Sequence, residues 1–89
     1  MKKKVAVIVR DRQQEALRMS VGLTLADNQV TVFIMDRKLE AGEEIDIAVE
    51  TLGAMNAKLI SNNPENNFDR MTTEEIARAL TGFDTVIPY

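Results

Sequence analysis

The sequence predicts an α/β fold in which a parallel β-sheet lies between layers of helices. Two observations carry this prediction: four short apolar runs are typical of buried strands, and three helical patterns separate them. Strands that alternate with helices in this way form βαβ units, whose strands are parallel. With 89 residues the chain is expected to form one domain, residues 1–89.

The predicted strands differ in length and in strength of signal. The first, Val5–Val9, is a continuous β-branched run, which is typical of a strand covered on both faces. The others are expected at Val30–Met35, Lys58–Ile60 and Thr85–Ile87. Because Pro88 cannot donate a ladder hydrogen bond, the last strand is expected at an edge or only briefly paired.

The first predicted helix, about Gln13 to Asp27, carries two apolar stripes. One consists of Ala16, Met19, Leu23 and Ala26, and the other of Leu17, Val21 and Leu25. Ser20 and Thr24 form a narrow polar stripe. An ordinary surface helix has a single apolar stripe, so the second stripe is expected to need a partner.

The second and third predicted helices have clear starting signals. Acidic residues crowd the first turn of the second helix, Glu43–Met55, where they favour helix stabilisation over a catalytic carboxylate pair. In the third helix Thr72 and Glu75 have capping-box spacing, and Met71 and Ile76 have the spacing of a hydrophobic staple. Gly82 is expected to end it in the left-handed conformation, with Phe83 packed back onto its last turn.

A strand order of 2-1-3-4 is expected, the start of a flavodoxin-like sheet. Right-handed crossovers would then place the first helix alone on one face and the other two helices on the opposite face. Apolar sheet surface and the stripe of Leu17, Val21 and Leu25 would remain open, which predicts an interface. We therefore expect a homo-oligomer or assembly with a related chain; the alternative is that these surfaces meet within one chain.

Composition narrows the possible chemistry. The chain has no cysteine and no histidine, which removes disulfides, thiolate zinc sites, thiol nucleophiles and the usual neutral-pH base. No cofactor is expected, and an enzymatic role is disfavoured but left open. The net charge of −3 does not favour nucleic acid.

The lysines at the start are interpreted as a solvated entrance to the first strand. Lys2, Lys3 and Lys4 precede an apolar run that is too short for a signal peptide, and no stretch reaches transmembrane length. The sequence therefore predicts a soluble cytoplasmic protein with no membrane partner.

Candidate ligand-binding residues follow the strands, since ligands of open parallel sheets bind beyond the carboxyl ends of the strands. They are Arg10, Asp11, Arg12, Asp36, Arg37, Lys38, Ser61, Asn62, Asn63 and Tyr89. These groups could bind a small anion or a nucleotide, although no glycine-rich phosphate loop is present. Solvated, salt-bridged loops are the alternative. A phosphoacceptor site is disfavoured, because Asp11 and Asp36 are the only aspartates expected there and both have arginines beside them.

The segment AKLISNNPENN, residues 57–67, is interpreted as a strand followed by a turn. Its asparagine amides are expected to cap backbone groups, and Pro64 to end the strand. A ligand site is the alternative for the same residues.

The segments VAVIVRD, QEALRMSVGLTLADNQVTVFIMD and IDIAVETLGAMNAKLISNN resemble the DsrE/DsrF-like family, which includes the sulfur-relay proteins TusD, TusC and TusB. The resemblance covers nearly the whole chain and implies a flavodoxin-like fold that forms oligomers. The family's sulfur carriers have a persulfide-forming cysteine just after the third strand, where this chain has Ser61 or Asn62. The resemblance therefore implies a non-catalytic member, an assembly subunit or accessory protein with a possible link to sulfur trafficking.

Overall fold

The computed structural model describes residues 3–66 and 68–89, so Lys2 and Asn67 lie outside the described residues. Its sheet has five parallel strands in the order β4-β3-β2-β1-β5. The strands are β1 (Lys4–Val9), β2 (Gln29–Ile34), β3 (Lys58–Ser61), β4 (Asp69–Arg70) and β5 (Thr85–Pro88).

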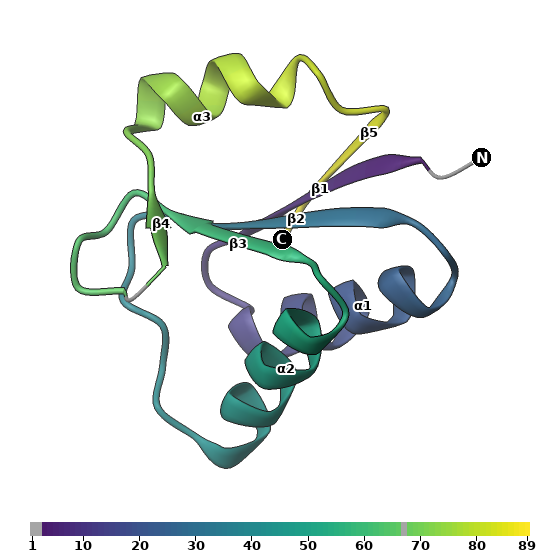
Figure 1. Cartoon of the computed structure of the whole chain (residues 1–89). Coiled ribbons are helices and arrows are strands. Elements are labelled where there is room, and N and C mark those ends of the chain that lie inside the picture. The colour runs from purple at the N-terminus through teal and green to yellow at the C-terminus, as the bar shows by residue number, and fades with distance from the viewer. Residues whose placement is uncertain (1–2, 67) are drawn as a thin grey trace.

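Helices cover both faces of this sheet, which confirms the predicted flavodoxin-like, three-layer α/β class (Figure 1). Helices α1 (Gln13–Leu25) and α2 (Glu43–Ala54) lie together on one face, and α3 (Thr73–Leu80) lies on the other. The sheet has one strand more than predicted, because β4 contains only two charged residues and has no apolar signal.

The predicted strand order 2-1-3-4 is wrong. β2 pairs with β1 on one side and β3 on the other, and the order reverses only when the chain crosses from β4 to β5 beside β1. The five residues Val30–Ile34 of β2 are all buried, which requires a neighbour on each side as well as cover on each face. The last strand does lie at an edge, as Pro88 predicts.

The predicted placement of the helices is also wrong. The steps β1 to β2 and β2 to β3 move in the same direction across the sheet, so their helices share a face. The step from β4 to β5 runs in the opposite direction, so α3 is the helix that stands alone on its face (Figure 1). The two stripes of α1 therefore meet the sheet and α2 within one chain, which is the alternative that the sequence left open.

The three residues of the predicted interface stripe on α1 differ in how far they are exposed. Leu17 is fully buried in the core beneath α1, so it cannot take part in an interface. Val21 is partly buried beside α2, and Leu25 remains 72% exposed. Ser20, which the sequence placed on a polar stripe, is fully buried, and its hydroxyl donates to the carbonyl oxygen of Ala16.

The core consists of two clusters, one on each face of the sheet. The larger cluster packs α1 and α2 against alternate residues of β1 and β2, such as Val7 and Val32. The smaller cluster packs Ile76 of α3 against Ala6, Phe33 and Met35. Phe83 extends it with an edge-to-face contact to Phe33, whose ring centroids are 5.7 Å apart.

The helix ends follow the predictions only in part. The capping box of Thr72 and Glu75 is confirmed, with both reciprocal hydrogen bonds at 3.1 Å. Gly82 does not adopt a left-handed conformation, so that prediction is wrong. The left-handed ends belong to Asp27 (φ 64°) after α1 and Asn56 (φ 63°) after α2.

Candidate functional site

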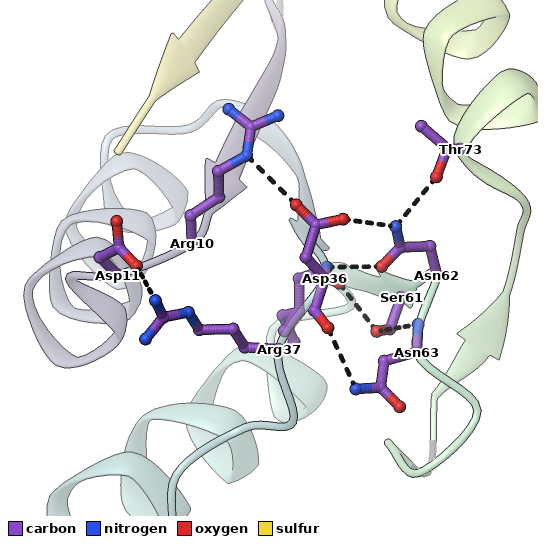
Figure 2. Close-up of polar contacts among 9 residues, drawn as sticks. Arg10, Asp11, Asp36, Arg37, Ser61, Asn62, Asn63 and Thr73 are labelled. Carbon is purple, nitrogen blue, oxygen red and sulfur yellow. Dashed lines mark hydrogen bonds and ion pairs between the residues drawn. The ribbon is translucent and has the colours of Figure 1, made fainter.

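Three loops meet at the carboxyl end of the sheet, where the sequence places its candidate residues (Figure 2). Arg10, Asp11 and Arg12 follow β1; Asp36, Arg37 and Lys38 follow β2; and Asn62 and Asn63 follow Ser61 at the end of β3. Tyr89, after β5, joins this edge through backbone hydrogen bonds with Ile8 and Arg10. The strand order reverses between β1 and β5, so Arg10 and Tyr89 flank the point where open α/β sheets bind ligands.

The arginines of this edge are paired with carboxylates. Arg10 Nε lies 3.7 Å from Asp36 Oδ2, and Arg37 Nη2 lies 3.1 Å from Asp11 Oδ1. Arg12 Nη1 lies 3.9 Å from Glu15 Oε2, one turn along the chain. All of these side chains are well exposed, so each pair contributes at most about 1 kcal/mol. This agrees with the alternative of solvated, salt-bridged loops.

Asn62 ties the loop after β3 to the loop after β2 and to α3. Its Oδ1 accepts a hydrogen bond from the Asp36 backbone N–H at 2.6 Å. Its Nδ2 donates to Asp36 Oδ1 and to the Thr73 hydroxyl, both at 3.0 Å (Figure 2). All three partners belong to the protein itself, so the Asn62 amide acts as a connector.

Ser61 is the centre of a buried polar cluster. The residue is 1% exposed, and its hydroxyl donates to the carbonyl oxygen of Ile34 at 2.7 Å. The same oxygen accepts from the Asn63 backbone N–H at 3.1 Å and from Asn66 Nδ2 at 2.8 Å. A serine hydroxyl has one donor and two acceptor positions, so its hydrogen-bonding capacity is filled.

Asn63 and Asn66 hold the backbone between β2 and α2. Asn66 Nδ2 also donates to the carbonyl oxygen of Arg37 at 3.2 Å, and its Oδ1 accepts from the Leu39 N–H at 2.8 Å. Asn63 Nδ2 donates to the carbonyl oxygen of Asp36 at 3.3 Å. The predicted capping role of the described asparagines is therefore confirmed, although they cap a loop distant in sequence as well as their own turn.

Gln13, which the sequence did not single out, holds the same loop from the other side. It is 3% exposed; its Oε1 accepts from the Glu40 N–H at 2.7 Å, and its Nε2 donates to the carbonyl oxygen of Lys38 at 3.3 Å. The one feature of the sequence that could have indicated this role is that Gln13 is a polar residue in the first turn of a helix face that is otherwise apolar. Thr73, which accepts from Asn62 Nδ2, was likewise missed as part of this network.

A shallow polar hollow lies beside the start of α1. Arg12 occupies the N-cap position without a side-chain cap hydrogen bond, so the first backbone N–H groups of α1 lack that partner. Asp11, Glu15 and Glu40 line the hollow together with Arg12 and Arg18. The lining of this hollow therefore carries three carboxylates and two guanidinium groups.

The described part of the chain contains neither a cluster of metal ligands nor a membrane-spanning helix. Among its residues no group of three or more carboxylates is placed to hold a metal ion. Within the same residues no helix has the length and apolar character needed to cross a membrane. Every buried side-chain nitrogen or oxygen in the described residues has a hydrogen-bond partner.

Fold and site together define a three-layer parallel α/β protein whose carboxyl-end loops are joined by asparagine side chains. Comparisons of this chain with protein families, with curated proteins and with solved structures found no match.

Proposed function

We propose that this chain is a non-catalytic DsrE-like protein that acts as an oligomer-forming subunit or accessory protein. The observation that carries the proposal is the set of hydrogen bonds made by the Ser61 hydroxyl. This residue stands at the end of β3, near the position where the sulfur carriers of the resembled family have their cysteine. Its hydroxyl is buried and fully engaged with Ile34, Asn63 and Asn66, so it serves the fold and is not free to act as a nucleophile.

The other side chains at the carboxyl end of the sheet, which we call the rim, support the same proposal. The carboxylates of Asp11 and Asp36 are paired with arginines, and the Asn62 amide is used within the protein. A general base needs a proton to abstract within hydrogen-bond reach, and the Ser61 hydroxyl donates its own proton to a backbone carbonyl. These contacts favour a rigid rim over a reacting one.

Exposed apolar side chains support a role in assembly. Leu25, Ile47 and Val86 are 72%, 55% and 38% exposed, and Leu25 and Ile47 belong to α1 and α2 on the same face of the sheet. Exposed apolar groups that gather on one face mark interaction surfaces. The proposal includes the predicted cytoplasmic location and, as its most specific part, a link to sulfur trafficking.

Two measurements test the proposal. Size-exclusion chromatography with light scattering should give a mass above that of a single 10.0 kDa chain. Mixing the protein with a purified DsrE-like chain that carries a persulfide should produce a co-eluting complex. A monomer that also fails to bind such a chain would contradict the proposal, whereas a homo-oligomer without that binding would remove only the link to sulfur.

A second candidate function is binding of a small anion or nucleotide at the rim. It is favoured by the uncapped start of α1, which lies next to Arg10 and Arg12 at the reversal of the strand order. Thermal-shift measurements with phosphate, nucleotides and sulfur oxyanions test it. The expected result is a stabilisation that Arg12→Ala removes; no shift with any of these anions would rule it out.

A further inference from the structure

The outer surface of α1 and α2 carries a hollow and a protrusion next to each other. The hollow, of about 330 Å³, has Val21, Ala48 and Thr51 among its lining residues. Ile47 borders it and is 55% exposed. A surface that has a protruding apolar side chain beside an apolar hollow can dock onto a copy of itself.

Opposite charges lie on the two helices at one end of this hollow. Arg18 of α1 has its Nη2 3.7 Å from Glu44 Oε2 of α2, and Gln14 of α1 also donates to Glu44. Both charged side chains are largely exposed, at 74% and 65%. The α1 side of the hollow therefore presents a cation to solvent and the α2 side an anion at the same height along the helices.

We propose that this face binds a second copy of the chain, in a two-fold symmetric dimer whose axis runs along the groove between α1 and α2. The inference rests on the proposed function, because it names the surface through which the subunit assembles. Such an axis lays α1 of each copy over α2 of the other. Arg18 then faces the partner's Glu44, and Ile47 faces the partner's hollow beside Val21.

Symmetry makes a second copy the occupant that fits. A two-fold interface uses the same patch twice, so the patch must be complementary to itself. Here the cation on α1 matches the anion on α2, and the protrusion of Ile47 matches the hollow. An unrelated partner would have to supply an anion opposite Arg18, a cation opposite Glu44 and an apolar group opposite the hollow, whereas a second copy supplies all three by symmetry.

The interface is small, which sets the conditions of the test. Two helices of 13 and 12 residues are each roughly 20 Å long, so the buried area per copy falls below the roughly 800 Å² of a standard interface. Sedimentation velocity should therefore span about 5 to 500 µM, the range in which weak dimers dissociate. The wild-type chain is expected to shift from monomer to dimer across it.

Charge reversal on each helix gives the decisive experiment. Arg18→Glu and Glu44→Arg should each weaken dimerisation roughly tenfold or more, because each places like charges across the two-fold interface. An equimolar mixture of the two variants should form the dimer again, because every intermolecular pair in the heterodimer then has opposite charges. Glu74→Arg on α3, at the other face of the sheet, is the matched control and should dimerise like the wild type.

Ile47→Asp provides an independent check on the apolar contact. The side chain is exposed in the single chain, so the variant should keep the far-ultraviolet circular dichroism of the wild type and lose the dimer. A wild-type dimer that none of these variants weakens would overturn this inference and leave the proposed function standing. A chain that stays monomeric throughout would overturn this inference, and it would contradict the proposed function only if the chain also fails to bind a DsrE-like partner. A mixture that fails to reassociate would overturn the two-fold arrangement.

Discussion

The side chain of Asn62 forms two hydrogen bonds with Asp36: its Oδ1 accepts from the Asp36 backbone N–H, and its Nδ2 donates to the Asp36 carboxylate. Asp36 has a positive φ of 69°, a conformation that few non-glycine residues adopt. A residue after β3 thus fixes the backbone and the carboxylate of a residue after β2, and that carboxylate in turn lies next to Arg10. The candidate site is positioned by contacts between loops as well as by its own strands.

Asn66→Ala is expected to be the most destabilising of the described asparagine substitutions. Asn66 is 9% exposed and bonds to Ser61, Arg37 and Leu39, so its loss leaves buried groups without partners. We expect a decrease of about 1–3 kcal/mol in the free energy of unfolding, measured by urea denaturation. Asn62→Ala, at a position that is only partly buried, is the matched control; an equal loss there would contradict the importance of burial.

Cysteine substitutions at neighbouring positions should behave differently. Ser61→Cys puts a larger and weaker hydrogen-bonding group at a filled, buried position, so we expect a loss of about 1–3 kcal/mol by urea denaturation. Asn62→Cys changes a side chain that is only partly buried and should cost about 1 kcal/mol or less, while leaving the thiol open to a labelling reagent. Equal tolerance at both positions would mean that the Ser61 cluster contributes little to stability.

The capping box at the start of α3 should make the free energy of unfolding depend on pH. The backbone N–H of Thr72, and to a lesser extent its hydroxyl, hold the pKa of the Glu75 carboxyl below its ordinary value of 4.5. A lowered pKa in the folded state stabilises the protein above the unfolded value, and this stabilisation is lost as the pH falls through the folded value. Glu75→Ala should therefore cost more stability near pH 7 than at about pH 3, because the hydrogen bond from the Thr72 N–H to the ionised carboxylate is present only at the higher pH. Urea denaturation at both values measures it, and an equal cost at the two would contradict the assignment.

Asn56 should accept glycine better than alanine. The chain leaves α2 with Asn56 in the left-handed conformation, and the Asn56 and Ala57 N–H groups donate to the carbonyl oxygens of Gly53 and Leu52. Asn56→Gly should raise the melting temperature slightly, and Asn56→Ala should cost about 1 kcal/mol because a Cβ disfavours this conformation. A lower melting temperature for the glycine variant would show that the asparagine side chain contributes more than its backbone conformation.

Sequence patterns predicted the elements of the fold well where the signal was apolar or local. The continuous apolar runs gave the four longer strands, and the spacing of Thr72 and Glu75 gave the start of α3. The strand order failed because it depends on which surfaces meet, and local periodicity does not contain this information. The clue lay in Val30–Ile34, where Thr31 is the single polar residue: a strand segment that is apolar on both faces favours the middle of a sheet, and all five residues are buried.

Polar residues account for most of what the sequence could not predict about the site. Gln13 and Ser20 carry polar groups that normally indicate a solvated helix face, yet both are buried because their hydrogen bonds are made within the protein. The asparagines were correctly interpreted as capping groups. Their hydrogen-bond partners lie 26 to 29 residues away in the sequence and come within reach because β2 and β3 are neighbours. The predicted strand order did not place these two strands side by side.

The position of β1 in the sheet has a consequence for the protein as it is synthesised. β1 is made first, but its second neighbour is β5, and the contact between them is anchored where Lys4 N donates to Asp84 Oδ2. Until residues 85–88 have left the ribosome, one edge of β1, made of valine and alanine, has no strand to pair with. A nascent or truncated chain that stops before Thr85 therefore exposes an apolar parallel edge, a recognised starting point for aggregation. Completion of the sheet is thus tied to completion of its last strand.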